Sequence, residues 1–119
     1  MVVERKSLDD LIGCITKERD RFIRELTRIR AFPNPLVIVE ADWTDLVYGK
    51  YRSRLEPKSA THSVISWIGR YGVPFQFVGT HKNAEGFVSY YLFSTARRIL
   101  DRLDKTLQKL TDRKMVSEL

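Results

Sequence analysis

The pattern of apolar and polar positions predicts three short strands separated by helices. Residues 2–6 are an extended segment with an apolar start, and residues 36–41 form a continuous apolar run of strand length. Such runs are typical of strands covered on both faces of a parallel sheet. Residues 74–79 supply the third predicted strand, in which Phe75 and Phe77 alternate with other residues. The chain therefore carries the strands of a small sheet.

Helices are predicted between these strands. A first helix begins after Ser7, and a second covers residues 17–30, whose apolar side chains recur at intervals of three and four. A third begins at residue 59 or 61 and is stopped by Gly72, because glycine readily adopts the left-handed conformation that ends helices. Alternating strands and helices favour a three-stranded parallel sheet joined by right-handed crossovers.

A last helix is predicted from about residue 83 to residue 109 or beyond. It carries an apolar stripe made of Phe87, Val88, Tyr91, Leu92, Ala96, Ile99, Leu103, Leu107 and Leu110. At 1.5 Å per residue the helix would reach about 40 Å, which is longer than a domain of this size can cover. We expect residues 1–119 to be a single domain whose last turns either need a partner or fray.

Composition narrows the classes of partner. The 21 Lys and Arg residues exceed the 15 Asp and Glu residues, and the resulting formal charge of +6 favours an anionic partner such as DNA. The single cysteine, Cys14, excludes an internal disulfide and a thiolate metal cluster. We find no apolar run long enough for a membrane span and no signal peptide, so we expect a cytoplasmic protein that does not enter a membrane.

The triplet Glu4-Arg5-Lys6 lies in the first predicted strand. Side chains two apart share one face of a strand, so Glu4 and Lys6 are expected to point together while Arg5 points away. A carboxylate can hold a divalent cation and an ammonium can stabilise phosphate charge, which is the chemistry of phosphodiester cleavage. The alternative for this pair is an exposed ion pair at the edge of the sheet.

Other polar residues have two interpretations each. Asp10 stands where it can complete the N-terminal cap of the helix after Ser7, or contribute to a site. Glu40 follows a predicted parallel strand, at the end where α/β proteins gather ligands, and it can also cap the next segment. Basic residues of the polar segment 42–59 suit a loop that contacts phosphate. They are Arg52, Arg54 and Lys58.

The string ERKSLDD, in which three spacers separate Lys6 from Asp10, resembles the signature GD…ERKxxxD of the XPF-type structure-specific endonucleases. The resemblance extends over roughly residues 1–100. Arg19 corresponds to the arginine of the family's Gly-Arg corner, although Glu18 replaces the glycine. Further similar segments are residues 36–40, 51–59 and 73–78.

This resemblance implies an α/β fold with a restriction-endonuclease-like core of the PD-(D/E)xK kind, a short parallel sheet flanked by helices. It implies Glu4, Lys6 and Asp10 as catalytic residues, with Mg²⁺ or Mn²⁺ held by Glu4 and the backbone carbonyl of Arg5. Glu40 is a further candidate for the metal. Arg19 is expected to approach the DNA backbone, unless it is only a solvent-exposed helix residue.

The family also places a Gly-Asp pair on the strand that precedes the ERK strand. Because three residues precede Glu4 here, we expect an amino-terminally truncated version of the fold. The resemblance then predicts a metal-dependent DNA endonuclease acting at branched or junction DNA, with homodimerisation as a further expectation. The alternatives are a non-catalytic DNA-binding or dimerisation module of the same fold, and a small structural protein that dimerises through its last helix.

Overall fold

The computed structural model describes residues 1–118, with side chains as far as Lys114. It contains two compact units, Met1–Phe87 and the chain from Val88 onward. The first unit holds a three-stranded sheet, four helices and the start of the last helix. The second unit consists of the continuation of that helix.

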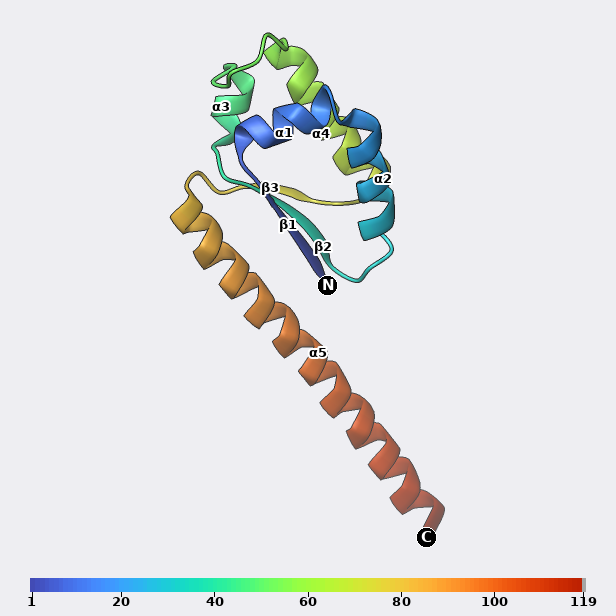
Figure 1. Cartoon of the computed structure of the whole chain (residues 1–119). Coiled ribbons are helices and arrows are strands. Elements are labelled where there is room, and N and C mark those ends of the chain that lie inside the picture. The colour runs from blue at the N-terminus through green and yellow to red at the C-terminus, as the bar shows by residue number, and fades with distance from the viewer. Residues whose placement is uncertain (119) are drawn as a thin grey trace. The chain divides into compact units, whose positions relative to one another are not determined.

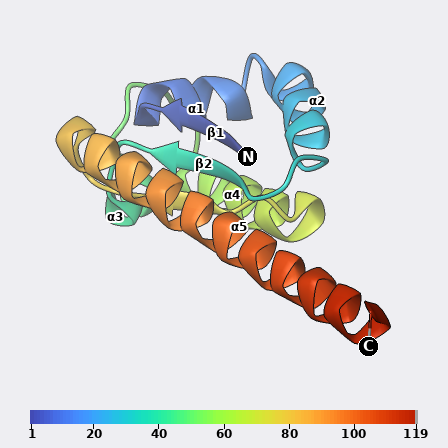
Figure 2. The ribbon, with the colours of Figure 1, turned by 90° about the horizontal axis from the view of Figure 1, so that it is seen from below.

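The sheet is built from β1 (Val2–Lys6), β2 (Pro35–Val39) and β3 (Phe75–Phe77) in the order β1-β2-β3. Both pairings are parallel, with Glu4 beside Val37 and Val37 beside Phe75. Figure 2 shows β1 and β2 side by side and pointing the same way. The predicted parallel α/β sheet is confirmed, and β1 lies at one edge of it.

The helices are α1 (Leu8–Ile15), α2 (Arg19–Ile29), α3 (Trp43–Val47), α4 (Pro57–Tyr71) and α5 (His81–Glu118). Helices α1 to α4 lie on one face of the sheet (Figure 1). The main core lies between this face and the helices. It includes Leu11, Phe22, Leu26, Val37, Val39, Val64 and Trp67.

Local signals explain several helix boundaries. The Ser7 side chain accepts a hydrogen bond from the Asp10 backbone N–H at 3.1 Å and caps α1 as expected. Gly72 ends α4 with a φ of 66°, in the left-handed region where a Cβ is unfavourable. Helix α4 starts at Pro57, before the predicted residue 59 or 61, because proline suits the first helical turn.

The ends of two other helices lie close to the expected positions. Helix α1 continues through Gly13 to Ile15 and ends at Thr16, whose hydroxyl donates to the Ile12 carbonyl at 2.8 Å. The last helix begins at His81, two residues before the expected start. Among the described residues, no helix is both long enough and apolar enough to cross a membrane.

Candidate functional site

Strand alternation places Glu4 and Lys6 on the face of the sheet that carries the core. Their neighbours in the sheet, Val37 and Val39, belong to the core cluster, whereas Arg5 is paired with Ile38 and projects from the opposite face. The sequence predicted this division of the triplet. Glu4 and Lys6 therefore meet the helices that cover the core face.

Helix α2 brings a second carboxylate to Glu4. Burial is the main cause that raises the pKa of Glu4 above its usual value, followed by a hydrogen bond with the Glu25 side chain and the charge of Glu25. The charges of Lys6 and Arg28 act in the opposite direction without cancelling this shift. Both glutamates are half-buried. Glu4 and Glu25 thus form a carboxyl pair whose negative charge the protein compensates incompletely.

Lys6 lies between the aromatic core and a small hollow. Its ammonium is 5.7 Å from the centroid of the Phe22 ring, a distance at which the ring face attracts a cation. The hollow has a volume of about 280 Å³. Its lining residues are Lys6, Asp9, Asp10, Gly13, Cys14, Lys17 and Glu18. The ammonium is therefore held beside a space bordered by acids of α1.

Asp10 contributes to the cap of α1 through its backbone and not through its side chain. Its backbone N–H takes part in the cap with Ser7, while its exposed side chain lines the hollow together with Lys6. The capping bond uses no atom of the Asp10 carboxylate. The structure thus brings Asp10 and Lys6 to one hollow, and a site role for Asp10 stays a prediction.

A second hollow, of about 350 Å³, adjoins the first along α1. Asp9, Gly13 and Lys17 border both, and Arg52 and Ser53 border the second. The backbone N–H of Arg52 donates to the Asp9 carboxylate at 3.1 Å, which fixes the loop against α1. Lys6, Lys17 and Arg52 consequently follow one another along this surface.

The remaining predicted DNA contacts lie in different surroundings. The Arg19 guanidinium donates to the Ile15 carbonyl at 3.2 Å and to Ser63 Oγ at 3.1 Å, and it lies 5.1 Å from the Trp67 ring centroid. These contacts join the start of α2 to α4. Arg54 and Lys58 are exposed, and Lys58 borders a separate hollow of about 460 Å³ beside α4.

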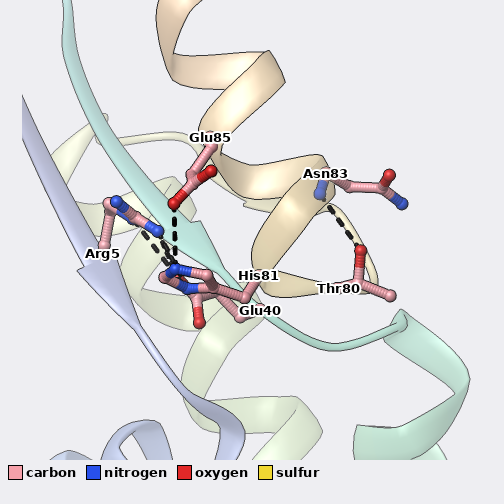
Figure 3. A network of polar contacts seen from close by, with 6 residues as sticks. All are labelled: Arg5, Glu40, Thr80, His81, Asn83 and Glu85. Atoms are coloured by element: carbon pink, nitrogen blue, oxygen red, sulfur yellow. Dashed lines mark hydrogen bonds and ion pairs between the residues drawn. The ribbon is translucent and has the colours of Figure 1, made fainter.

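Glu40 lies on the opposite face of the sheet from Glu4. Its Oε1 atom accepts hydrogen bonds from Arg5 Nη2 at 2.9 Å and Nε at 3.3 Å, and lies 3.0 Å from His81 Nδ1. His81 Nε2 is 3.1 Å from Glu85 Oε1. Figure 3 shows Arg5 and His81 converging on Glu40. The structure does not bring Glu40 to Glu4, and its metal role stays a prediction without support from this geometry.

The charge of Glu40 is well compensated. Desolvation is the largest single influence and raises its pKa, but hydrogen bonds and positive charge from Arg5 and His81 together outweigh it and lower the pKa below the usual value. At the start of α5, the backbone N–H of Asn83 donates to Thr80 Oγ1 at 3.1 Å (Figure 3). The network thus joins the first turn of α5 to the ends of β1 and β2.

The sequence did not identify Glu25, Lys17 or His81 as parts of these clusters. Glu25 lies on the polar side of an amphipathic helix, one turn from the core residue Phe22, and that spacing places it near the helix face that meets the sheet. Within the described residues, no group of three or more His, Cys, Asp or Glu residues could hold a metal ion. The Arg5 carbonyl is directed to the open edge of β1, because the neighbouring Lys6 carbonyl bonds toward the β2 side.

The whole first unit, including Glu4, Lys6, Asp10 and Glu25, falls within a known domain. A search of curated proteins finds no match to the chain. Comparison with protein families matches residues 1–91, about three quarters of the chain, to the ERCC4 domain. This match agrees with the α/β architecture and supports a nuclease-type function in DNA processing. The chain belongs to the ERCC4 domain family.

Proposed function

We propose that this chain is a metal-dependent DNA endonuclease domain whose chemistry is centred on Glu4 and Lys6. The observation that carries the proposal is the pairing of these two side chains on one face of β1, with Glu25 of α2 added beside Glu4. Family membership supports a DNA-processing role. The order of the signature along β1 and α1 supports Asp10 as a third catalytic residue.

The donor set fits a hard divalent cation that keeps much of its water. Mg²⁺ is commonly bound through one or two carboxylates together with substrate phosphates, and Glu4 and Glu25 supply two carboxylates. Burial and the neighbouring Glu25 raise the pKa of Glu4, and a bound cation would favour the ionised form of Glu4. Bound Mg²⁺ or Mn²⁺ would supply an activated water and stabilise phosphate charge. The Arg5 carbonyl at the open edge is a further candidate ligand.

The residues of the chain have different roles in this reaction. Glu4 and Glu25 hold negative charge where the cation is needed, and Lys6 stabilises the charge that develops on the phosphate. The Phe22 ring beneath the ammonium holds Lys6 in place and limits its contact with water. Asp10 borders the same hollow and can hold a water by hydrogen bonding.

The two hollows along α1 suggest a path for the DNA backbone. Lys6, Lys17 and Arg52 border this surface, and cations along one surface can contact the phosphates of a DNA strand. Arg54 in the following loop and Lys58 in the first turn of α4 add further positive charge. Arg19 is already engaged with Ser63 and Trp67, so we assign it to holding α2 against α4. Action at branched or junction DNA, a cytoplasmic location and homodimerisation complete the proposal.

Cleavage of branched DNA by the purified chain, with Mg²⁺ or Mn²⁺ present, tests the proposal. We expect Glu4→Gln and Lys6→Met to lower the rate by roughly 100-fold or more, the range found when one electrostatic group is removed from an active site. Glu56→Gln is the matched control, because Glu56 is exposed and lies at the start of α4, outside both hollows. If both site variants cleave DNA at the wild-type rate, the assignment of Glu4 and Lys6 to the catalytic site is refuted.

Binding must be measured on the same proteins. We expect Glu4→Gln to retain salt-dependent binding to DNA, because it removes no positive charge. Binding by the wild-type chain without cleavage in any divalent ion would contradict the enzyme and favour the non-catalytic DNA-binding module.

A further inference from the structure

The part of α5 beyond residue 92 carries a regular apolar seam. Helix α5 is a single continuous helix (Figure 1). Apolar side chains recur along it at alternating intervals of three and four, which is the heptad spacing of a coiled coil. The seam consists of Phe93, Ala96, Leu100, Leu103, Leu107 and Leu110. All of its large side chains are more than half exposed.

We infer that this seam joins two copies of the chain as an antiparallel coiled coil. In that arrangement residues 93, 100 and 107 occupy heptad position a, and residues 96, 103 and 110 occupy position d. Each a residue then faces a d residue of the other copy. Phe93 meets Leu110, Leu100 meets Leu103 and Leu107 meets Ala96, so every layer is apolar. The inference concerns the second unit and does not depend on nuclease activity.

Charge complementarity selects a second copy as the occupant. Arg97 and Asp104 both occupy position e, which flanks the seam on one side. Antiparallel coiled coils bring the e positions of the two helices together, so Arg97 of each copy meets Asp104 of the other. Within the described helix neither side chain forms an ion pair of its own. A two-fold axis repeats this contact, as in an isologous dimer.

A parallel pairing fits the same residues less well. It would place Arg97 beside Leu92 and Asp104 beside Ile99 of the partner, which leaves both charges without an opposite charge. It would also stack Ala96 on Ala96. Lys114, which occupies the next position a after Leu107, would stack on Lys114 of the partner. Small residues facing each other leave a gap, and like charges in the seam repel. The antiparallel pairing instead sets the small Ala96 against Leu107.

The exposed apolar area is of the size that a dimer requires. A stable interface buries at least about 1,000 Å² in total, or roughly 500 Å² from each partner. Five large side chains of the seam, each more than half exposed, can supply an area of that order from each copy. Phe93, Ala96, Arg97, Leu100, Asp101 and Asp104 border one open groove on the helix surface. Seam and e-position charges therefore share a single surface.

Sedimentation velocity of the full chain over a concentration series tests the association. We expect a monomer–dimer equilibrium that Leu103→Asp weakens by at least about 100-fold, because it places a charge in the central layer. Ser94→Asp is the matched control, since it adds the same charge at an exposed position away from the seam and should leave the equilibrium within about threefold of wild type. A chain that stays monomeric, or equal dimerisation in all three proteins, would overturn the inference.

A charge-exchange cycle tests the orientation. Arg97→Asp and Asp104→Arg should each weaken dimerisation by about 3- to 30-fold, because each creates two like-charge contacts per dimer. The double variant restores opposite charges and should recover the wild-type constant to within about threefold. If the double variant instead weakens dimerisation by the sum of the two single effects, the antiparallel pairing is ruled out, because residues 97 and 104 contact each other only in that orientation.

A distance measurement gives an independent reading of orientation. A spin label at Asp112→Cys, in a chain whose buried Cys14 is replaced by Ala, should lie opposite residue 91 of the partner. The two labels would then be separated by about 30 Å along the axis at 1.5 Å per residue. In a parallel coiled coil the two labels would lie side by side at a much shorter distance, and that result would refute the inference.

Discussion

Glu4 and Glu40 lie on opposite faces of the same small sheet, and their surroundings have opposite effects on the carboxylate charge. Glu4 is half-buried beside another acid, and its pKa is raised. Glu40 receives hydrogen bonds from a guanidinium and an imidazole, and its pKa is lowered. Compensated charge of the second kind is typical of a structural contact, whereas uncompensated charge is typical of a site that awaits a ligand. The comparison therefore assigns different roles to two residues that the sequence had grouped around one metal.

The largest difference is expected in catalysis. We expect Glu25→Gln to slow metal-dependent DNA cleavage by at least about 10-fold, because the cation loses one of two carboxylates. Glu40→Gln should leave the rate within about threefold of wild type, since Glu40 faces Arg5 and His81 instead. Initial rates at saturating Mg²⁺ provide the measurement. Equal losses in the two variants would remove the distinction between the faces.

Stability should respond to the same two sites with opposite signs. Glu40→Gln removes charge-assisted hydrogen bonds between a half-buried carboxylate and two more exposed partners, and should lower the free energy of unfolding by about 1 kcal/mol after screening by solvent. Glu4→Gln relieves a carboxyl pair and should raise it at neutral pH by about 0.5 kcal/mol. Urea unfolding of both variants without divalent ions measures the two effects. A loss of stability in Glu4→Gln would show that the protein already compensates this charge.

The two carboxyls should affect stability in different pH ranges, Glu40 below and Glu4 above the usual glutamate pKa of about 4.3. Glu40 has a lowered pKa in the folded state, so its contribution is present above the usual pKa and is lost as the pH falls through the folded value. Glu4 has a raised pKa, so stability falls as the pH rises from the usual value through the folded one. The free energy of unfolding should be measured from pH 3 to pH 7. The rise with pH that comes from Glu40 should be absent in Glu40→Gln, and the fall with pH that comes from Glu4 should be absent in Glu4→Gln.

A further small effect on stability is expected at Gly13, which borders both hollows on the Glu4 side. A Cβ built at this position meets no atom within 4 Å, and the residue lies inside α1. Gly13→Ala should therefore stabilise the chain by about 0.5–1 kcal/mol, because alanine loses less backbone entropy in a helix. Thermal unfolding measures this gain. Destabilisation would indicate that the surface between Lys6 and Arg52 is closed in solution.

Much of the fold could be predicted because its signals are local. The apolar run of β2, the Ser7 cap and the left-handed Gly72 each depend on a few neighbouring residues, and the structure confirms them. The shared face of Glu4 and Lys6 follows from the period of a strand alone. A short-range pattern was therefore sufficient to define the centre of the candidate site.

The partners of these residues could not be predicted in the same way. Glu25 meets Glu4 only because α2 packs beside the edge of β1, and His81 meets Glu40 only where the start of α5 reaches the strand ends. Such contacts depend on how elements distant in sequence pack together. Arg19, which the resemblance places near the DNA backbone, also contacts Trp67 and Ser63 of α4, and this packing could not be read from the local sequence.

The titration of individual glutamate carboxyls by NMR, with and without Mg²⁺, tests the central claim most directly. A cation at the Glu4–Glu25 pair favours the ionised form, so the pKa of Glu4 should fall from its raised value when Mg²⁺ is added. The lowered pKa of Glu40 should stay where it is. A Glu4 pKa that does not respond to Mg²⁺, or equal shifts at both residues, would contradict the assignment of the metal site to the Glu4 face.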